Sequence, residues 1–192
     1  MTTIKQTLRL LVLIGVLSCW HATAAPEIPV AAPMNTELAG ATATVAVPSV
    51  FRVICLKTKS SGTGFLLKSG VIVTAQHVIN DAGTNGVIVI TAMGQLIHIT
   101  NIVQDVTLDL AALTPSEKLN GPCLQISTNA TLKIGMQVST WGFPEGYQGF
   151  VPLLTTGYIS GMDVPDASKG NMTQRIVVNA AFNRGNSGGA SR

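Results

Sequence analysis

The chain has 192 residues, of which 46% are hydrophobic, 11% are charged and 5% are aromatic, and its formal net charge is +3. This length suits one domain or two small halves with a sizeable core, and the low charge argues against a disordered, highly solvated chain. Two of the twelve basic residues, Lys5 and Arg9, lie close to the N-terminus. Without them, ten basic residues face nine acidic ones, a balance that argues against a nucleic-acid-binding protein.

Residues 1–24 are predicted to be a secretory signal peptide. Lys5 and Arg9 form a positively charged start, residues 10–20 form an apolar run of eleven, and residues 22–24 (Ala-Thr-Ala) have the small-x-small pattern of a cleavage site. As a helix, this run would rise about 16 Å, roughly half of a bilayer core, so no stable membrane span is expected after cleavage. The alternative is a buried core helix. The chain is therefore predicted to be exported, to the periplasm or the extracellular space.

Three cysteines raise separate questions. Residues 16–19 (Val-Leu-Ser-Cys) faintly resemble a lipoprotein cleavage box, so a lipid anchor at Cys19 stays open. Cys55 and Cys123 would remain after cleavage, and in an oxidising compartment they could pair if their Cα atoms came within about 7 Å. The preferred interpretation is two small buried hydrophobic side chains. Neither has the close Cys or His neighbours of a zinc site, and no metal or other cofactor is predicted.

The chain changes character at Pro48. Residues 25–47 are rich in Ala, Pro and Thr and have no sustained period, so they are predicted to be a flexible leader outside the core. Short β-type runs follow, with hairpin turns predicted at Ser69-Gly70 and Asn85-Gly86 and a short helical piece after His77. The predicted strands are, in chain order, Val50–Lys57, Gly64–Lys68, Val71–Ala75, Gly86–Thr91, Gln95–Val103, Leu108–Thr114, Cys123–Ile126, Gln137–Trp141, Val151–Ser160 and Arg175–Ala180.

Short, regularly spaced strands indicate an all-β sandwich or barrel. The Asn-Gly-Pro break within residues 118–122 predicts two halves, about 48–117 and 122–192.

Two histidines remain after removal of the signal peptide, His77 and His98. His77 directly follows an apolar strand, which would hold its imidazole at the rim of a sheet on rigid backbone. A lone histidine in such a place is more often structural. His98 alternates with apolar residues and is expected to face solvent from a strand.

Asp109 is flanked by Leu108 and Leu110 in an apolar stretch. Burying a carboxylate is costly unless it is hydrogen-bonded, and an imidazole N–H is a suitable donor. The pattern therefore predicts a buried Asp109 paired with a histidine. A turn aspartate before a strand is the alternative, and Asp105 fits that role better.

Ser187 lies between glycines in Asn183–Ala190 (NRGNSGGA). Glycines allow unusual backbone angles and close approach of a ligand to main-chain N–H groups, and such groups can stabilise an oxyanion. Alone the motif is weak, because Gly/Ser/Asn clusters are ordinary turns. The order His77, Asp109, Ser187 is that of the trypsin-like proteases and differs from the orders of lipases and subtilisins.

The chain resembles the HtrA/Deg branch of the chymotrypsin superfamily over roughly residues 50–190. The segments that carry this resemblance are, in chain order, Gly62-Thr63-Gly64-Phe65, Thr74-Ala75-Gln76-His77-Val78, Asp109-Leu110-Ala111, Trp141-Gly142-Phe143-Pro144, Thr156-Gly157-Tyr158-Ile159-Ser160-Gly161 and Asn183-Arg184-Gly185-Asn186-Ser187-Gly188-Gly189.

The resemblance implies a chymotrypsin-like double β-barrel with the active site between the barrels. His77 would act as general base on Ser187, and Asp109 would fix the tautomer of His77. The backbone N–H groups of Gly185 and Ser187 would form the oxyanion hole. Ala181 would lie at the base of the specificity pocket, which favours small or medium apolar side chains. Proteins or peptides, including unfolded ones, would be the substrates.

The sequence departs from this family at its C-terminal side. The strand and hairpin that follow the Gly-Gly pair in trypsin-like folds are absent, as is the PDZ domain of many HtrA proteins, so the second barrel is expected to be incomplete. A fragment of a longer protein is the preferred interpretation over a truncated gene product. The leading hypothesis is an exported serine endopeptidase. Its competitors are an inactive or impaired protease-like remnant acting as a binding or chaperone module, and an extracellular β-domain with coincidental motifs.

Overall fold

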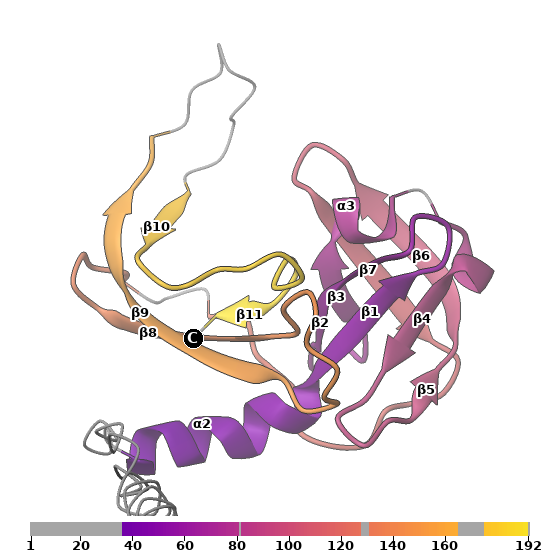
Figure 1. Ribbon diagram of the computed structural model, residues 1–192, viewed down its shortest axis with the longest axis horizontal. Helices are drawn as coiled ribbons and strands as arrows, with labels where there is room; N and C mark the ends of the chain where they lie inside the picture. The colour runs from indigo at the N-terminus through magenta and orange to yellow at the C-terminus, as the bar shows by residue number, and fades with distance from the viewer. Residues whose placement is uncertain (1–35, 81, 128–130, 165–174, 192) are drawn as a thin grey trace, which may run out of the picture. The chain divides into compact units, whose positions relative to one another are not determined.

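A computed structural model describes residues 36–80, 82–127, 131–164 and 175–191. The chain divides into two compact units, Met1–Thr36 and Glu37–Arg192, and all described residues except Thr36 belong to the second. The predicted signal peptide and the cysteine within it lie outside the described residues. The strands of the second unit form two antiparallel sheets (Figure 1).

The first sheet has seven strands in the order β5-β4-β1-β2-β3-β7-β6 and curls into a nearly closed barrel (Figure 1). Its strands are β1 (Val50–Cys55), β2 (Ser60–Leu66), β3 (Ile72–Ala75), β4 (Val87–Ile90), β5 (Leu96–Ile97), β6 (Ile99–Asp105) and β7 (Leu110–Pro115).

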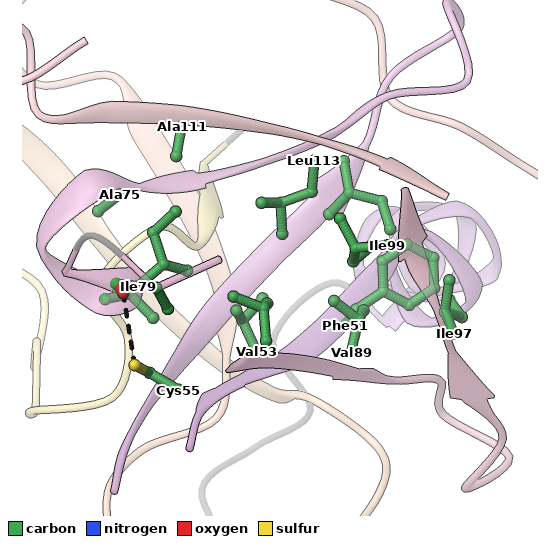
Figure 2. Close-up of a cluster of buried hydrophobic side chains, with 14 of the residues drawn as sticks. Phe51, Val53, Cys55, Ala75, Ile79, Val89, Ile97, Ile99, Ala111 and Leu113 are labelled. Atoms are coloured by element: carbon green, nitrogen blue, oxygen red, sulfur yellow. Dashed lines mark hydrogen bonds between the residues drawn. The ribbon is translucent and has the colours of Figure 1, made fainter. Parts of the chain in front are cut away.

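The interior of this barrel is filled by alternating residues of the strands. Val53, Ile72, Val89 and Leu113 are fully buried there, and Figure 2 shows Val53, Val89 and Leu113 pointing into one cluster with Phe51. Side chains of successive strand residues point to opposite faces of a sheet, so a period of two places one set inside. Each fully buried aliphatic side chain stabilises the fold by about 1.5–3 kcal/mol. This core makes the first sheet a rigid support for the residues at its rim.

One of the two predicted hairpin turns is confirmed. Between β2 and β3, the N–H of Gly70 donates to the carbonyl of Leu67 at 2.9 Å, with Gly70 at φ +84°. The turn predicted at Asn85-Gly86 is wrong, because a 3₁₀ turn, η1 (Thr84–Gly86), occupies this position. The next strand, β4, pairs with β1 and not with β3. The segment between β3 and β4 therefore connects two strands that are not neighbours in the sheet, and it is not a hairpin.

Two strand predictions also need correction. The run 95–103 is divided into β5, which pairs with β4, and β6, which pairs with β7. The chain changes pairing partner at His98, whose side chain is exposed but lies between strands. The run 123–126 forms no strand, since it makes only an isolated bridge between Leu124 and Leu67.

The second sheet has four strands in the order β10-β9-β8-β11. They are β8 (Gln137–Gly142), β9 (Leu153–Met162), β10 (Ile176–Val178) and β11 (Ala190–Ser191). The sequence did not predict β11, whose two residues pair with Trp141 and Thr140 of β8. The sheet is partial, and several large apolar side chains along β9 and β10 are exposed: Leu153, Leu154, Tyr158, Ile176 and Val177.

The prediction of an unpacked leader is wrong for its last part, which forms helix α2 (Thr36–Ser49). Ala46 is buried in a cluster with Val50, Trp141 and Phe143. The segment is rich in alanine, the strongest helix former, but its small residues leave no visible helical period. None of the helices in the described part of the chain is long and apolar enough to cross a membrane.

Cys55 and Cys123 are both free thiols. Cys55 is fully buried in the first barrel, and its Sγ lies 3.4 Å from the carbonyl oxygen of Ile79 (Figure 2). Cys123 is half-buried and packs against the same core. The structure therefore agrees with the interpretation of two small packed side chains and contains no disulfide between them.

Candidate functional site

His77 lies at the rim of the first barrel, on the short helix α3 (Gln76–Ile79) that directly follows β3. The helix begins where the N–H of Gln76 donates to the backbone carbonyl of Asp109 at 3.1 Å. It ends at Asn80, which adopts a left-handed conformation. Val78 and Ile79 are buried in the core. The helix is therefore anchored at both ends while the His77 side chain stays exposed.

Asp109 makes two contacts with His77. Its Oδ1 accepts the backbone N–H of His77 at 2.9 Å, and its Oδ2 lies 2.7 Å from the Nδ1 atom of the ring. The pairing of Ala75 with Leu110 between β3 and β7 brings the two residues together. This two-point contact fixes the imidazole relative to the carboxylate.

The prediction that Asp109 is buried is wrong, since its side chain is 50% exposed and that of His77 is 57% exposed. Leu108 and Leu110 are also exposed. Asp109 lies in the turn between β6 and β7, at φ +54°, so apolar neighbours in sequence do not enclose it. Asp105 is the turn aspartate that was predicted, and its Oδ1 accepts the N–H of Leu108 at 3.0 Å.

The contacts with His77 keep the Asp109 carboxyl ionised. Partial burial raises its pKa, but hydrogen bonds from the backbone N–H and the ring of His77, the charge of that ring and the backbone of Gln76 together lower the pKa below its ordinary value. An ionised Asp109 favours a proton on Nδ1 of His77. The other nitrogen, Nε2, is then free to accept a proton.

Ser187 lies in a tight loop between β10 and β11. The N–H of Asn186 donates to the carbonyl of Asn183 at 3.1 Å, and the N–H of Gly189 donates to that of Asn186 at 2.9 Å. The loop is joined to the first sheet by the N–H of Thr63 on β2, which donates to the carbonyl of Ser187 at 2.9 Å. The side chain of Ser187 is half-buried.

Two positions in this loop require glycine. Gly185 has φ +90°, and a Cβ there would lie 2.4 Å from the carbonyl oxygen of Phe143. Gly188 has φ +81°, and a Cβ there would lie 2.2 Å from the carbonyl oxygen of Thr63 and 2.7 Å from the nitrogen of Ala75. Gly188 follows Ser187 directly, and Ala75 precedes His77 by two residues. The close contact between Gly188 and Ala75 therefore brings the serine loop beside the start of α3.

Among the described residues, several N–H donors of the loop remain unpaired, and two of them matter for the site. Within the described residues, the backbone N–H groups of Gly185 and Ser187 donate to no protein acceptor. Within the same residues, no hydrogen bond joins the Ser187 hydroxyl to the His77 ring. Such bonds are often long in a free site and tighten when a substrate is bound. The site can thus offer a hydroxyl, an imidazole and two unpaired N–H groups to a ligand.

Ala181 lies exposed between β10 and the serine loop, next to Phe182, whose N–H donates to the carbonyl of Ala180. No group of three or more His, Cys, Asp or Glu side chains that could hold a metal ion occurs in the part of the chain that the structure describes.

Sequence reasoning missed three residues in and around the site: the Thr63 hydroxyl donates to the carbonyl of Gly185, the Thr74 hydroxyl donates to the carbonyl of Thr63, and Arg52 donates to the carbonyls of Tyr147 and Gly149. Thr63 and Thr74 lie within the segments that carry the resemblance, but nothing in the sequence shows which backbone groups their hydroxyls contact. Arg52 has no sequence signal, because it follows an apolar strand start like an ordinary surface residue.

Comparisons with known proteins agree on one family. The profile of the trypsin-like peptidase domain matches residues 62–191. A serine protease Do-like HtrA of Lactobacillus helveticus is 36% identical over 140 residues, which are 70% of this chain and 33% of that protein. A probable periplasmic serine endoprotease, DegP-like, of Bartonella henselae is 36% identical over 129 residues, which are 67% of this chain and 24% of that protein. The chain thus spans a third or less of these two relatives.

Among solved structures, the serine endoprotease from Yersinia pestis matches with a TM-score of 0.64 at 28% identity, covering 83% of this chain and 54% of that chain. With the nearly closed first barrel and the partial second sheet, this match confirms the predicted all-β, chymotrypsin-like fold with an incomplete second barrel.

Proposed function

Because the chain belongs to the family of trypsin-like peptidase domains and is HtrA-like, we propose that it is an exported serine endopeptidase that hydrolyses peptide bonds with Ser187, His77 and Asp109. The observation that supports this most is the two-point contact of Asp109 with the backbone N–H and Nδ1 of His77. A carboxylate that merely capped the turn would not need to reach the imidazole.

In the proposed reaction, the Ser187 hydroxyl attacks the carbonyl carbon of the substrate while Nε2 of His77 takes its proton. His77 then gives this proton to the leaving amine as the peptide bond breaks. Water next attacks the acyl group and gives a proton to His77, which returns it to Ser187 as the acyl group leaves. Asp109 keeps the proton of the resting imidazole on Nδ1 and stabilises the charged imidazolium that forms.

The oxyanion of the tetrahedral intermediate is proposed to bind the N–H groups of Gly185 and Ser187. The carbonyl of Arg184 accepts the N–H of Glu145 at 2.6 Å. Since C=O and N–H of one peptide point in opposite directions, this bond leaves the N–H of Gly185 directed away from Glu145 and unpaired. A pair of fixed donors of this kind is commonly the largest single contribution to acyl transfer.

Substrate choice is proposed to depend on Ala181 at the base of the specificity pocket. A small, uncharged side chain at this place favours small or medium apolar residues before the cleaved bond over Lys or Arg. The substrates are proposed to be proteins or peptides, because the relatives are named serine proteases and endoproteases.

Export is proposed from the signal-like start of the sequence, residues 1–24. The names of several relatives, among them the DegP-like protein of Bartonella henselae, include the word periplasmic. The export signal can be tested by fusing residues 1–24 to a reporter that is active only outside the cytoplasm. A silent reporter would contradict the proposal.

Labelling with a fluorophosphonate probe tests the proposed nucleophile. We expect Ser187→Ala to abolish labelling and Ser116→Ala, which changes an exposed serine outside the loop, to leave it unchanged. Labelling of the Ser187→Ala protein would contradict the assignment.

A binding or chaperone module without turnover is the second candidate. The exposed apolar side chains along β9 and β10 favour it, because contiguous apolar surface is typical of interaction sites. In this case the wild type and the Ser187→Ala variant should suppress the aggregation of an unfolded client equally, and neither should react with the probe.

A further inference from the structure

Thr63 is a polar residue in the middle of β2 with a fully buried side chain. A buried hydroxyl is unfavourable unless it is hydrogen-bonded, so its partners show what it is placed to do. Its Oγ1 donates to the carbonyl of Gly185 at 2.8 Å and accepts the backbone N–H of Phe143 at 3.0 Å. One hydroxyl therefore joins two segments of the second half of the chain.

The backbone of Thr63 adds two more contacts. Its N–H donates to the carbonyl of Ser187, and its carbonyl accepts the hydroxyl of Thr74 at 2.7 Å. Thr74 lies on β3, three residues before His77. Thr63 thus lies in a continuous hydrogen-bonded path from β3, the strand that directly precedes the helix of His77, to the loop that carries Ser187.

We propose that Thr63 is a positioning residue for the serine loop: its hydroxyl fixes the Gly185–Asn186 peptide, which lies between the two peptides that carry the proposed oxyanion donors. This inference rests on the proposed function. Thr63 touches no reacting atom. It acts through the carbonyl of Gly185 on one side of the loop and through the N–H of Phe143 on the other.

A second residue of the first sheet, Arg52, binds the segment that begins at Phe143. Arg52 is directly opposite Thr63 in the β1–β2 register, and opposite residues of an antiparallel pair project from the same face. Nη2 of Arg52 donates to the carbonyls of Tyr147 and Gly149 at 2.6 and 2.9 Å, and its guanidinium lies 5.0 Å from the centre of the Phe143 ring.

These two residues hold the segment 143–149 at both of its ends. Thr63 binds the N–H of Phe143, and Arg52 binds the carbonyls at the other end. Between them, the N–H of Glu145 holds the carbonyl of Arg184, the residue before Gly185. The segment therefore transmits the position of the first sheet to the serine loop, and Thr63 contacts both the segment and the loop.

The backbone of Gly142 and Gly189 lies close to the Thr63 side chain. A Cβ added at Gly142 would lie 3.0 Å from Oγ1 of Thr63, and one added at Gly189 would lie 3.7 Å from its methyl group. Valine has the same shape as threonine and fits this space, but it leaves the N–H of Phe143 and the carbonyl of Gly185 unpaired. Serine keeps the hydroxyl and loses only the methyl group.

The test compares Thr63→Val with Thr63→Ser in the full chain, with Thr100→Val as the matched control. Thr100 is exposed on β6, and its hydroxyl donates to a strand carbonyl outside the site at 3.2 Å. We expect Thr63→Val to lower kcat about 10- to 100-fold with KM changed less than about threefold, because a small misplacement of catalytic groups costs this much. Thr63→Ser should regain kcat to within about threefold of the wild type, and the control should match the wild type.

The pH dependence of kcat separates this role from damage to the His77–Asp109 pair. We expect the shape of the profile to be the same in Thr63→Val and the wild type, since neither His77 nor Asp109 contacts Thr63. Wild-type kcat in a folded Thr63→Val protein would overturn the proposal, as would equal losses in the Val and Ser variants. If Thr63→Val does not fold, Thr63→Ala replaces it, and the same comparison with Thr63→Ser decides.

Amide hydrogen exchange keeps the test independent of proteolysis. The N–H of Phe143 is bonded to the Thr63 hydroxyl, so its exchange should become faster in Thr63→Val than in Thr63→Ser. If the wild type neither cleaves substrates nor reacts with the probe, the proposed function fails, while faster exchange would still show that Thr63 orders the segment that contacts the loop. Equal exchange in both variants would overturn the role of Thr63 even in an active enzyme.

Discussion

Replacing Asp109 by Asn separates orientation of the imidazole from stability of the fold. Asn keeps the size of Asp and a carbonyl oxygen for the backbone N–H of His77, which now lies 2.9 Å from Oδ1. It places an NH₂ group where Oδ2 now faces Nδ1 at 2.7 Å. Two donors would then face each other unless His77 moves its proton from Nδ1 to Nε2. Nε2 would no longer accept the proton of Ser187.

The replacement should lower catalysis far more than it lowers the stability of the fold. A hydrogen bond to a charged group contributes about 1.5–3 kcal/mol, and because both side chains are about half exposed, 57% and 50%, we expect a loss of only about 1 kcal/mol in the free energy of unfolding. The wrong tautomer lowers kcat about 10⁴-fold in Ser-His-Asp triads, which corresponds to about 5.4 kcal/mol of transition-state stabilisation.

Peptide cleavage kinetics and urea unfolding of the same preparations measure both quantities. Asp105→Asn is the matched control, because Asp105 lies at the start of the same turn and accepts the N–H of Leu108, a contact that Asn can also make. Asp105→Asn should keep its kcat. A folded Asp109→Asn protein that loses less than about tenfold in kcat would refute the reasoning that Asp109 controls the tautomer.

Three further predictions concern stability and are checked by urea unfolding. Gly188→Ala should destabilise the fold by about 2 kcal/mol or more, because its Cβ would meet the carbonyl oxygen of Thr63; Gly70→Ala, at a similar φ but in open space, should cost about 1 kcal/mol. Arg52→Met should cost about 1–3 kcal/mol through its lost hydrogen bonds. The pKa of Asp109 is lowered on folding, so its ionised form stabilises the fold above its ordinary pKa of 3.8, and this stabilisation is lost as the pH falls below that value. At such low pH, the wild type should therefore lose more stability than Asp109→Asn.

The residues that define the barrel core could be predicted from the sequence because they follow a short-range rule. Val53, Ile72, Val89 and Leu113 lie in runs of β-branched and aliphatic residues, and all are fully buried. The turn at Gly70 was equally visible, since Ser-Gly between two such runs favours a hairpin. A period of two and a turn dipeptide involve only a few neighbouring residues, so no knowledge of the tertiary fold is needed to recognise them.

Features that depend on distant partners could not be predicted in this way. α2 packs Ala46 against Trp141 and Phe143, nearly a hundred residues away, and its own pattern of small residues gives no amphipathic signal. β11 has two residues and exists only because Ala190 pairs with Trp141. Asp109 was expected to be buried because its sequence neighbours are apolar, but burial depends on the position of the turn in space.

The supporting residues of the serine loop illustrate the same limit at the site itself. The glycines at 185 and 188 can be recognised in the sequence as permissive positions, but only the structure shows that each avoids contact with a particular backbone atom. The role of Thr63 is harder to predict from the sequence, because its hydroxyl contacts two residues that lie 80 and 122 positions further along the chain. A change at Thr63 can therefore disturb the site without altering any residue that takes part in the proposed chemistry. For this reason, loss of activity in a variant of this chain identifies a catalytic residue only when kcat, KM and the pH profile are measured together.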